Sequence, residues 1–225
     1  MKGTARSVGI LAAAGLLATA LPAPAADWPR WRGPLSDGRA GADERLVGPL
    51  SPAVAWQRPL GIGYSAIVVA DGRAVTLYAD AGTDFVVALD AASGELLWRH
   101  AIDAWLPPNG GSEGGAKSTP TIAGDVVYAL GPKGHLLAVR VADGTELWRR
   151  HLVADAGAVM PEFGFASSPV VVDGVVAVQI EGGTTHSLVG FDGRTGAIRW
   201  TLAGGAAEYE SPLAATLAST TSSSS

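Results

Sequence analysis

An eleven-residue phrase occurs three times in this chain, and each copy ends in a tryptophan. The copies occupy residues 88–98, 138–148 and 190–200, so their tryptophans lie 50 and 52 residues apart. A fixed period of this size is typical of repeat proteins, in which each unit buries its apolar face against its neighbours. The chain is therefore expected to consist of repeated supersecondary units on one scaffold.

A second phrase has the same spacing and precedes the first in each unit. Residues 118–127 match residues 167–176, residues 65–72 form a degenerate earlier copy, and Ser211-Pro212 begins a later one. Short apolar runs separated by Gly/Asp turns follow each copy, which predicts four short strands in every unit. Repeated four-stranded units are the blades of a β-propeller. We therefore expect an all-β propeller of about three blades plus the start of a fourth, forming part of a ring of seven or eight blades.

The first residues have the pattern of a secretory signal peptide. Lys2 and Arg6 are basic, residues 8–21 are apolar and rich in alanine, and Ala23-Pro24-Ala25 is a small-residue cleavage site. A retained membrane anchor is the alternative, although the apolar stretch is short for a span. The expected divisions are a signal peptide at 1–26, an N-terminal segment at 27–56, partial propeller blades at 57–217 and a disordered Ser/Thr tail at 218–225.

The composition restricts the location and the partners. The chain contains no cysteine, which excludes disulfides, thiolate metal sites and an acylated N-terminal cysteine. Its formal net charge is −5, and loss of Lys2 and Arg6 with the signal peptide would make it −7. A negative chain without a basic cluster does not suit nucleic acid or anionic membranes as main partners. A periplasmic or secreted location follows from the signal peptide.

The phrase Ala-x-Asp-x-x-(Ser/Thr)-Gly-x-x-x-Trp resembles the repeat of pyrroloquinoline-quinone-like (PQQ-like) β-propellers. That superfamily includes quinoprotein alcohol dehydrogenases and the propeller lipoprotein of the outer-membrane β-barrel assembly machinery. The run Asp-Trp-Pro-Arg-Trp-Arg-Gly-Pro at residues 27–34 also resembles the start of secreted bacterial members. The resemblance, which covers about residues 27–217, implies that each repeat tryptophan docks onto the turn of a neighbouring blade. The residues given this structural role are Trp98, Trp148, Trp200, Gly94, Gly144 and Gly196.

The chain also departs from that family in the residues that carry chemistry. The dehydrogenases use a vicinal cysteine pair beside PQQ and calcium, and this sequence has no cysteine. No residue here can be matched to their calcium ligands or catalytic aspartate, so no cofactor, metal site or catalytic residue is identified. Asp90 and Asp192 occupy one repeat position and are interpreted as hydrogen-bond acceptors for the turn that follows them.

The strongest binding candidates are the segments that lead into the first strand of each blade. That strand lies nearest the axis of a propeller, so the segments at residues 103–117, 154–166 and 203–210 should emerge on one face around the channel. Loops held by a rigid scaffold commonly carry recognition. The alternative is a set of solvated loops with aromatic rings folded over the blade tops. The candidate ligand- or partner-binding residues are Trp105, Asn109, Glu113, Lys117, Glu162, Phe163, Phe165, Glu208, Tyr209 and Glu210.

Four acidic groups on this face suggest a further hypothesis, in which their oxygens bind a hard cation such as calcium. These groups are Glu113, Glu162, Glu208 and Glu210.

Two functions remain open from the sequence. The first is a secreted, non-catalytic propeller that binds a protein, a peptide or a small ligand through its loop-bearing face. The second is a fragment of a PQQ- and calcium-dependent dehydrogenase of the alcohol type, in which the cofactor would carry the redox chemistry. Enzymatic activity is left undecided, with binding preferred. In both cases the remaining blades of a longer chain, or self-association, would be needed to close the ring.

Overall fold

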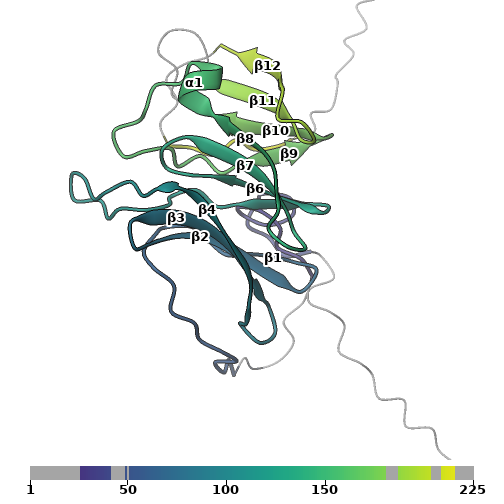
Figure 1. The fold of residues 1–225 in the computed structure, drawn as a ribbon. Helices are drawn as coiled ribbons and strands as arrows, with labels where there is room; N and C mark the ends of the chain where they lie inside the picture. The colour runs from purple at the N-terminus through teal and green to yellow at the C-terminus, as the bar shows by residue number, and fades with distance from the viewer. Residues whose placement is uncertain (1–25, 42–48, 50, 181–186, 204–208, 216–225) are drawn as a thin grey trace, which may run out of the picture.

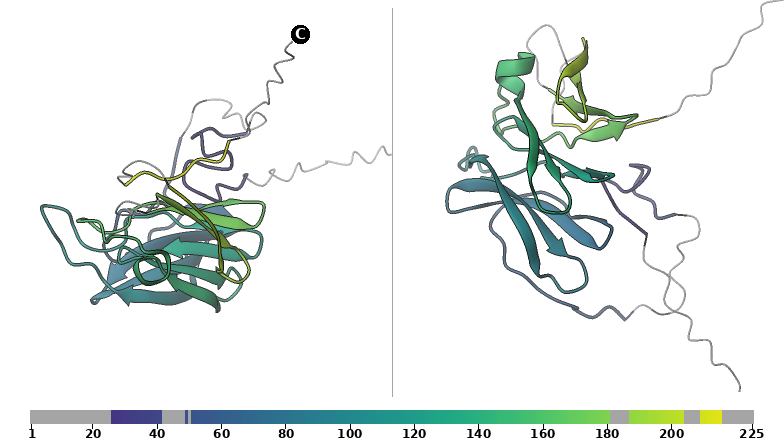
Figure 2. Two further views of the ribbon diagram at one scale, coloured as in Figure 1. Left: turned by 90° about the horizontal axis from the view of Figure 1, so that it is seen from above. Right: turned by 45° about the vertical axis from the view of Figure 1, so that its right-hand side comes forward.

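The computed structural model describes residues 26–41, 49, 51–180, 187–203 and 209–215, which form three antiparallel four-stranded sheets lying side by side (Figures 1 and 2). The order of strands within each sheet follows the chain, as expected for blades whose strands are joined by tight turns. The prediction of an all-β chain with three four-stranded blades is confirmed.

The strand bounds repeat with the period of the sequence. Blade 1 contains β1 (Val68–Ala70), β2 (Arg73–Asp80), β3 (Thr83–Asp90) and β4 (Leu96–Ala104). Blade 2 contains β5 (Thr121–Ala123), β6 (Val126–Leu130), β7 (His135–Arg140) and β8 (Glu146–His151). Blade 3 contains β9 (Val170–Val172), β10 (Val175–Gln179), β11 (Leu188–Asp192) and β12 (Ile198–Leu202).

One short helix, α1 (Leu152–Ala156), follows β8 and was not expected from the sequence. The His151 side chain caps it by accepting from Ala154 N, and Gly157 ends it in the left-handed conformation at φ 68°. Its single turn is too short to show a helical period in the sequence.

The core lies between the blades. Val127, Leu137 and Val139 of the middle sheet face blade 1, whereas Leu136 and Ala138 face blade 3. The middle sheet is therefore buried on both faces, which explains why its strands read as nearly continuous apolar runs.

Two repeat tryptophans join the blades at their outer edge. The Trp98 indole N–H of blade 1 donates to Val141 O of blade 2 at 2.8 Å, and the ring lies against Gly144. Trp148 repeats this arrangement with Gly193 O at 2.8 Å and with Gly196. Both tryptophans are buried, and each glycine leaves room for a ring that a Cβ would strike.

The Trp200 ring does not dock in this way. It lies against Gly190 of its own blade and is 39% exposed, because the described residues include no further blade on that side. The expectation that Trp200 docks onto a neighbouring turn therefore needs correction for this chain.

The turns before the tryptophans are held by the aspartates that the sequence indicated. Asp90 Oδ1 accepts from Ser93 N and from Ser93 Oγ, each at 2.8 Å. Asp192 Oδ1 accepts from Thr195 N at 2.9 Å and from Thr195 Oγ1 at 3.0 Å in the same way. The interpretation of both aspartates as turn acceptors is confirmed.

Candidate functional site

Hydrogen bonds between blades fix the segments that lead into the first strands. Ala66 N donates to Thr119 Oγ1 at 3.1 Å, Thr119 N donates to Ser168 Oγ at 3.0 Å, and Ser168 N donates to Ser211 Oγ at 2.9 Å. We call Thr119, Ser168 and Ser211 the hydroxyl belt. These bonds define equivalent positions on three blades and on the start of a fourth.

Equivalent residues lie two places before Ala66 and before each position of the hydroxyl belt. These residues are Tyr64, Lys117, Ala166 and Tyr209. Tyr64, Lys117 and Ala166 line a shallow hollow of about 540 Å³, together with Phe163 and residues 110–112. The structure thus brings two of the sequence candidates, Lys117 and Phe163, into one surface, which we call the mouth hollow.

Lys117 contacts an aromatic ring and the neighbouring loop in the mouth hollow. Its Nζ lies 4.8 Å from the centroid of the Tyr64 ring and donates to Ser112 Oγ at 2.8 Å and to Glu113 O at 3.0 Å. The Tyr64 hydroxyl accepts from Glu113 N at 2.9 Å. A cation over an aromatic face is a favourable contact, and here it also fixes the loop that carries Glu113.

A second tyrosine fixes the next loop. The Tyr209 hydroxyl accepts from Phe163 N at 3.2 Å, and the two rings lie 6.0 Å apart with their planes tilted by 50°. Asn109 Nδ2 donates to Glu162 O at 3.2 Å and so links the first loop to the second. The loops around the mouth hollow are therefore joined to one another as well as to the blades.

Two aromatic candidates are placed differently from the sequence hypothesis. Phe165 is 2% exposed and packs over Gly134 in the core between blades 2 and 3, so it is not available to a partner. Its inclusion among the binding residues is corrected. Trp105 is half-buried against Gly114 and belongs to the base of its loop.

The acidic candidates do not form a metal site in the part of the chain that the structure describes, where no three Asp, Glu or His side chains lie close enough together to hold an ion. Glu113 and Glu162 are exposed, and Glu210 Oε2 accepts from Gln179 Nε2 at 3.2 Å. Glu208 lies outside the described residues. The calcium hypothesis for Glu113, Glu162 and Glu210 therefore has no support from the geometry.

One buried carboxyl group was not indicated by the sequence. Asp84 of β3 is 0% exposed, lies opposite Asp103 of β4, and has no hydrogen-bond partner in ordinary geometry at either oxygen. Burial raises the pKa of Asp84 to about 6, and Asp103 acts in the same direction. The Leu106 backbone N–H and the charges of Lys133 and Lys117 oppose this change. Asp84 thus carries a proton more readily than an exposed aspartate.

Tyr64 was also missed as a site residue. The only available signal was its place two residues before Ala66, which is equivalent to Thr119 and Ser168. Because the copy of the second phrase at residues 65–72 is degenerate, that equivalence becomes clear only once the bonds between blades are seen.

Comparison with known proteins places these features in a family. A family model described as "Outer membrane protein assembly factor BamB" matches residues 42–224. The chain belongs to this family. Assembly factors called BamB from Burkholderia pseudomallei and Yersinia pestis are 29% and 28% identical over 148 and 160 residues, or 65% and 68% of this chain. The aligned regions are 32% and 37% of those proteins, so the chain matches about a third of their length.

The BamB-type fold of the chain is also seen in solved structures. The quinohemoprotein alcohol dehydrogenase of Comamonas testosteroni superposes with a TM-score of 0.54 at 19% identity, covering 79% of this chain and 27% of that one. This likeness concerns the fold alone.

Proposed function

We propose that this BamB-type chain is a secreted, non-catalytic propeller module that binds an extended segment of a partner polypeptide at the mouth hollow. The observation that carries the proposal is the convergence of Tyr64, Lys117 and Phe163 at the mouth, on loops that are joined to one another. Aromatic rings around a cation, presented by a rigid scaffold, are the features that recurring binding surfaces share.

The physical chemistry of the mouth hollow favours a polypeptide over a compact small molecule. Small-molecule sites are enclosed and mostly apolar, whereas this surface is shallow and open. The exposed backbone of residues 110 and 111 lies beside Lys117 and offers polar groups to an extended chain. The relatives' name, outer membrane protein assembly factor, also supports a role among protein partners.

The proposal includes export. Residues 1–26 act as a signal peptide, and the mature chain works in the periplasm or outside the cell. Among the described residues, no helix has the length and apolar character required to cross a membrane.

The experiment is a selection of displayed linear peptides against the full chain, followed by titration of the selected peptides. Phe163→Ala should weaken the selected peptides by about tenfold or more, which corresponds to about 1.4 kcal/mol. Leu97→Ala is the matched control, because Leu97 is 46% exposed on the outer strand β4, and its loss should leave the dissociation constant unchanged.

Two results would contradict the proposal. One is the absence of any enriched peptide that binds the folded chain in solution. The other is equal binding by the wild type and by Phe163→Ala, with both proteins folded by near-ultraviolet circular dichroism.

A further inference from the structure

The N-terminal segment lies across the innermost strands of blades 1 and 2. Trp28 N donates to Val69 O at 2.7 Å and Val69 N donates to Trp28 O at 3.0 Å, so Trp28 pairs with β1. Ile122 N of β5 donates to Pro29 O at 2.8 Å. The residues that follow, Arg30 to Ser36, are thereby brought against the first strands on the axial side.

This segment folds back on itself and fixes its arginines. Gly33 lies against the Trp28 ring, and Gly38 N donates to Arg32 O at 2.8 Å. Arg32 Nη2 donates to Asp37 O at 3.3 Å. Arg32 and Ser36 have φ values of 62° and 57°, a left-handed conformation that places both side chains in a compact turn.

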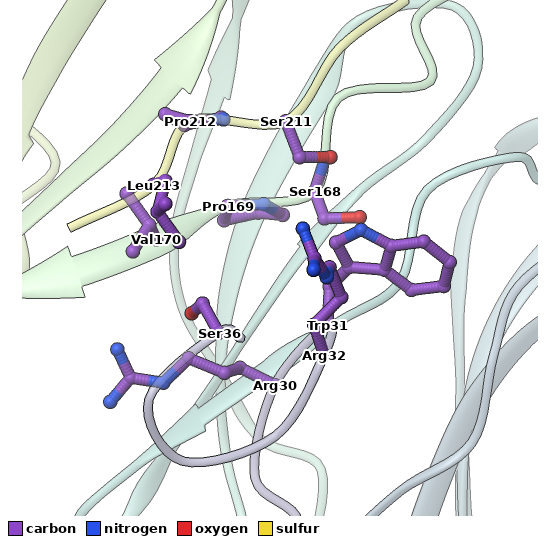
Figure 3. A pocket seen from close by; sticks show the side chains of 10 residues that line it. All are labelled: Arg30, Trp31, Arg32, Ser36, Ser168, Pro169, Val170, Ser211, Pro212 and Leu213. Carbon is purple, nitrogen blue, oxygen red and sulfur yellow. The ribbon is translucent and has the colours of Figure 1, made fainter. Parts of the chain in front are cut away.

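A small cavity of about 60 Å³ lies between this turn and the hydroxyl belt (Figure 3). Arginine, tryptophan and serine side chains supply its polar wall, and none of the described residues that line it carries a carboxylate. Figure 3 shows Arg32 pointing toward Ser168, whereas Arg30 extends away past Ser36. The residues that line the cavity are Arg30, Trp31, Arg32, Ser36, Ser168, Pro169, Val170, Ser211, Pro212 and Leu213.

One of these donors has no acceptor within the described residues. Arg30 Nε is buried without a hydrogen-bond partner, and neither Arg30 nor Arg32 forms an ion pair there. Ser168 and Ser211 accept belt bonds through their oxygens, so their hydroxyl hydrogens remain available to donate.

Such an arrangement favours an oxyanion. A buried guanidinium nitrogen such as Arg30 Nε is costly unless an anion or a hydrogen bond compensates it. A carboxylate or phosphate oxygen accepts from guanidinium, hydroxyl and indole donors alike, and guanidinium suits its geometry. The volume is about twice the share of one water molecule in the liquid, which suits a single oxyanion group.

We propose that this cavity binds an oxyanion, held by Arg32, Ser168 and Ser211 at one end and by Ser36 and the unpartnered Arg30 Nε at the other. The group is either a free ion such as phosphate or the carboxylate of a larger solute. The bound anion offsets positive charge on the arginines and joins the N-terminal segment to the belt. This site is separate from the mouth hollow in its residues and in its ligand chemistry.

The test is calorimetric titration of the full chain with sodium phosphate, sodium acetate and a short peptide with a free C-terminal carboxylate, each at fixed ionic strength. We expect saturable binding of at least one of these probes and a matching increase in the melting temperature. Saturation by phosphate identifies a free ion as the ligand, and saturation by the peptide with no response to phosphate identifies a carboxylate terminus.

Arg30→Gln removes the unpartnered Nε donor, so it should weaken binding by about tenfold and reduce the increase in melting temperature. Arg194→Gln removes the same charge from an exposed turn of blade 3 and should change neither. Arg30→Lys, which keeps the charge but loses the guanidinium geometry, should weaken binding while the protein stays folded.

Three results would overturn the proposal. They are no saturable binding of any probe to the folded wild type, binding that Arg30→Gln leaves intact, and equal losses in Arg30→Gln and Arg194→Gln. Equal losses in the two variants would show that binding depends on the net charge of the protein and not on the cavity. None of these results bears on the peptide selection, which depends on Phe163 and the mouth hollow.

Discussion

The Trp56 indole lies over Gly94 and donates from Nε1 to Ala91 O at 3.0 Å. Trp98 and Trp148 dock onto blades 2 and 3 in the same way, and Trp56 does so onto blade 1. Arg58, two residues after Trp56, donates to Gly94 O at 3.3 Å, as Arg150, two residues after Trp148, donates to Gly196 O at 2.8 Å. The segment around Trp56 therefore packs on blade 1 in the same way that the outer strand of one blade packs on the following blade.

The docked tryptophans should carry much of the stability of the blade interfaces. Trp148 is 6% exposed and Trp200 is 39% exposed, so they form a matched pair at the same repeat position. Trp148→Ala should lower the free energy of unfolding by about 3–5 kcal/mol, because it leaves a cavity between blades. Trp200→Ala should cost less than about 1.5 kcal/mol. Urea denaturation of both variants gives the comparison, and equal costs would contradict the docking role.

The contact between each docked tryptophan and the glycine beneath it can be tested separately from the backbone strain of the turn. Gly144→Ala and Gly174→Ala both place a side chain at positive φ, 72° and 74°. That strain should cost each variant about 1–2 kcal/mol. Only at position 144 would the new Cβ lie 2.7 Å from an indole ring, that of Trp98, whereas nothing lies within 4 Å at position 174. Gly144→Ala should therefore lose about 1–3 kcal/mol more in urea denaturation.

Asp84 should make stability depend on pH. Its pKa is about 6 in the folded chain and near 3.8 in the unfolded chain, so the folded state binds more protons between these values. Stability should therefore fall as the pH rises from about 4 to about 7, by on the order of 2–3 kcal/mol from this group. The Asp84→Asn variant should not show this decrease in stability between about pH 4 and about pH 7, because it has no carboxyl group at position 84 to titrate.

The measurement for Asp84 is the free energy of unfolding at several pH values for the wild type, Asp84→Asn and Asp80→Asn. The last variant removes an exposed carboxylate from the same hairpin and should keep the wild-type slope. A slope that Asp84→Asn leaves unchanged would show that this carboxyl group does not titrate in the window.

Export should expose Asp27 as the first residue of the mature chain. Asp27 Oδ1 accepts from Asp71 N at 3.2 Å, so the first residue of the mature chain would be held against blade 1. Mass spectrometry of the chain recovered from the periplasm of an expressing bacterium should show cleavage after Ala26. Recovery of an uncleaved chain in the membrane fraction would favour a retained anchor.

The repeated elements could be predicted because the sequence contains several copies of the same pattern. Three copies of one phrase indicated the blades, and Asp90 and Asp192 were interpreted correctly as turn acceptors. Trp56 was missed because no aspartate and glycine turn precedes it, so its docking position appears only in three dimensions.

The site was predictable only in outline. Phe163 and Phe165 are two residues apart in one loop, yet the first lines the mouth hollow and the second is buried over Gly134. A loop has no regular period from which the buried and the surface position could be predicted. The pairing of Trp28 with β1 and the burial of Asp84 likewise depend on contacts between segments distant in sequence.

The bonds of the hydroxyl belt all run in one direction along the chain, from Ala66 through Thr119 and Ser168 to Ser211. Each amide in this series is released to solvent only when its blade separates from the next one. Opening at an end of the series breaks one such bond, whereas displacing the middle blade breaks the bonds on both of its sides. Amide deuterium exchange along the belt therefore records which boundary between blades opens first.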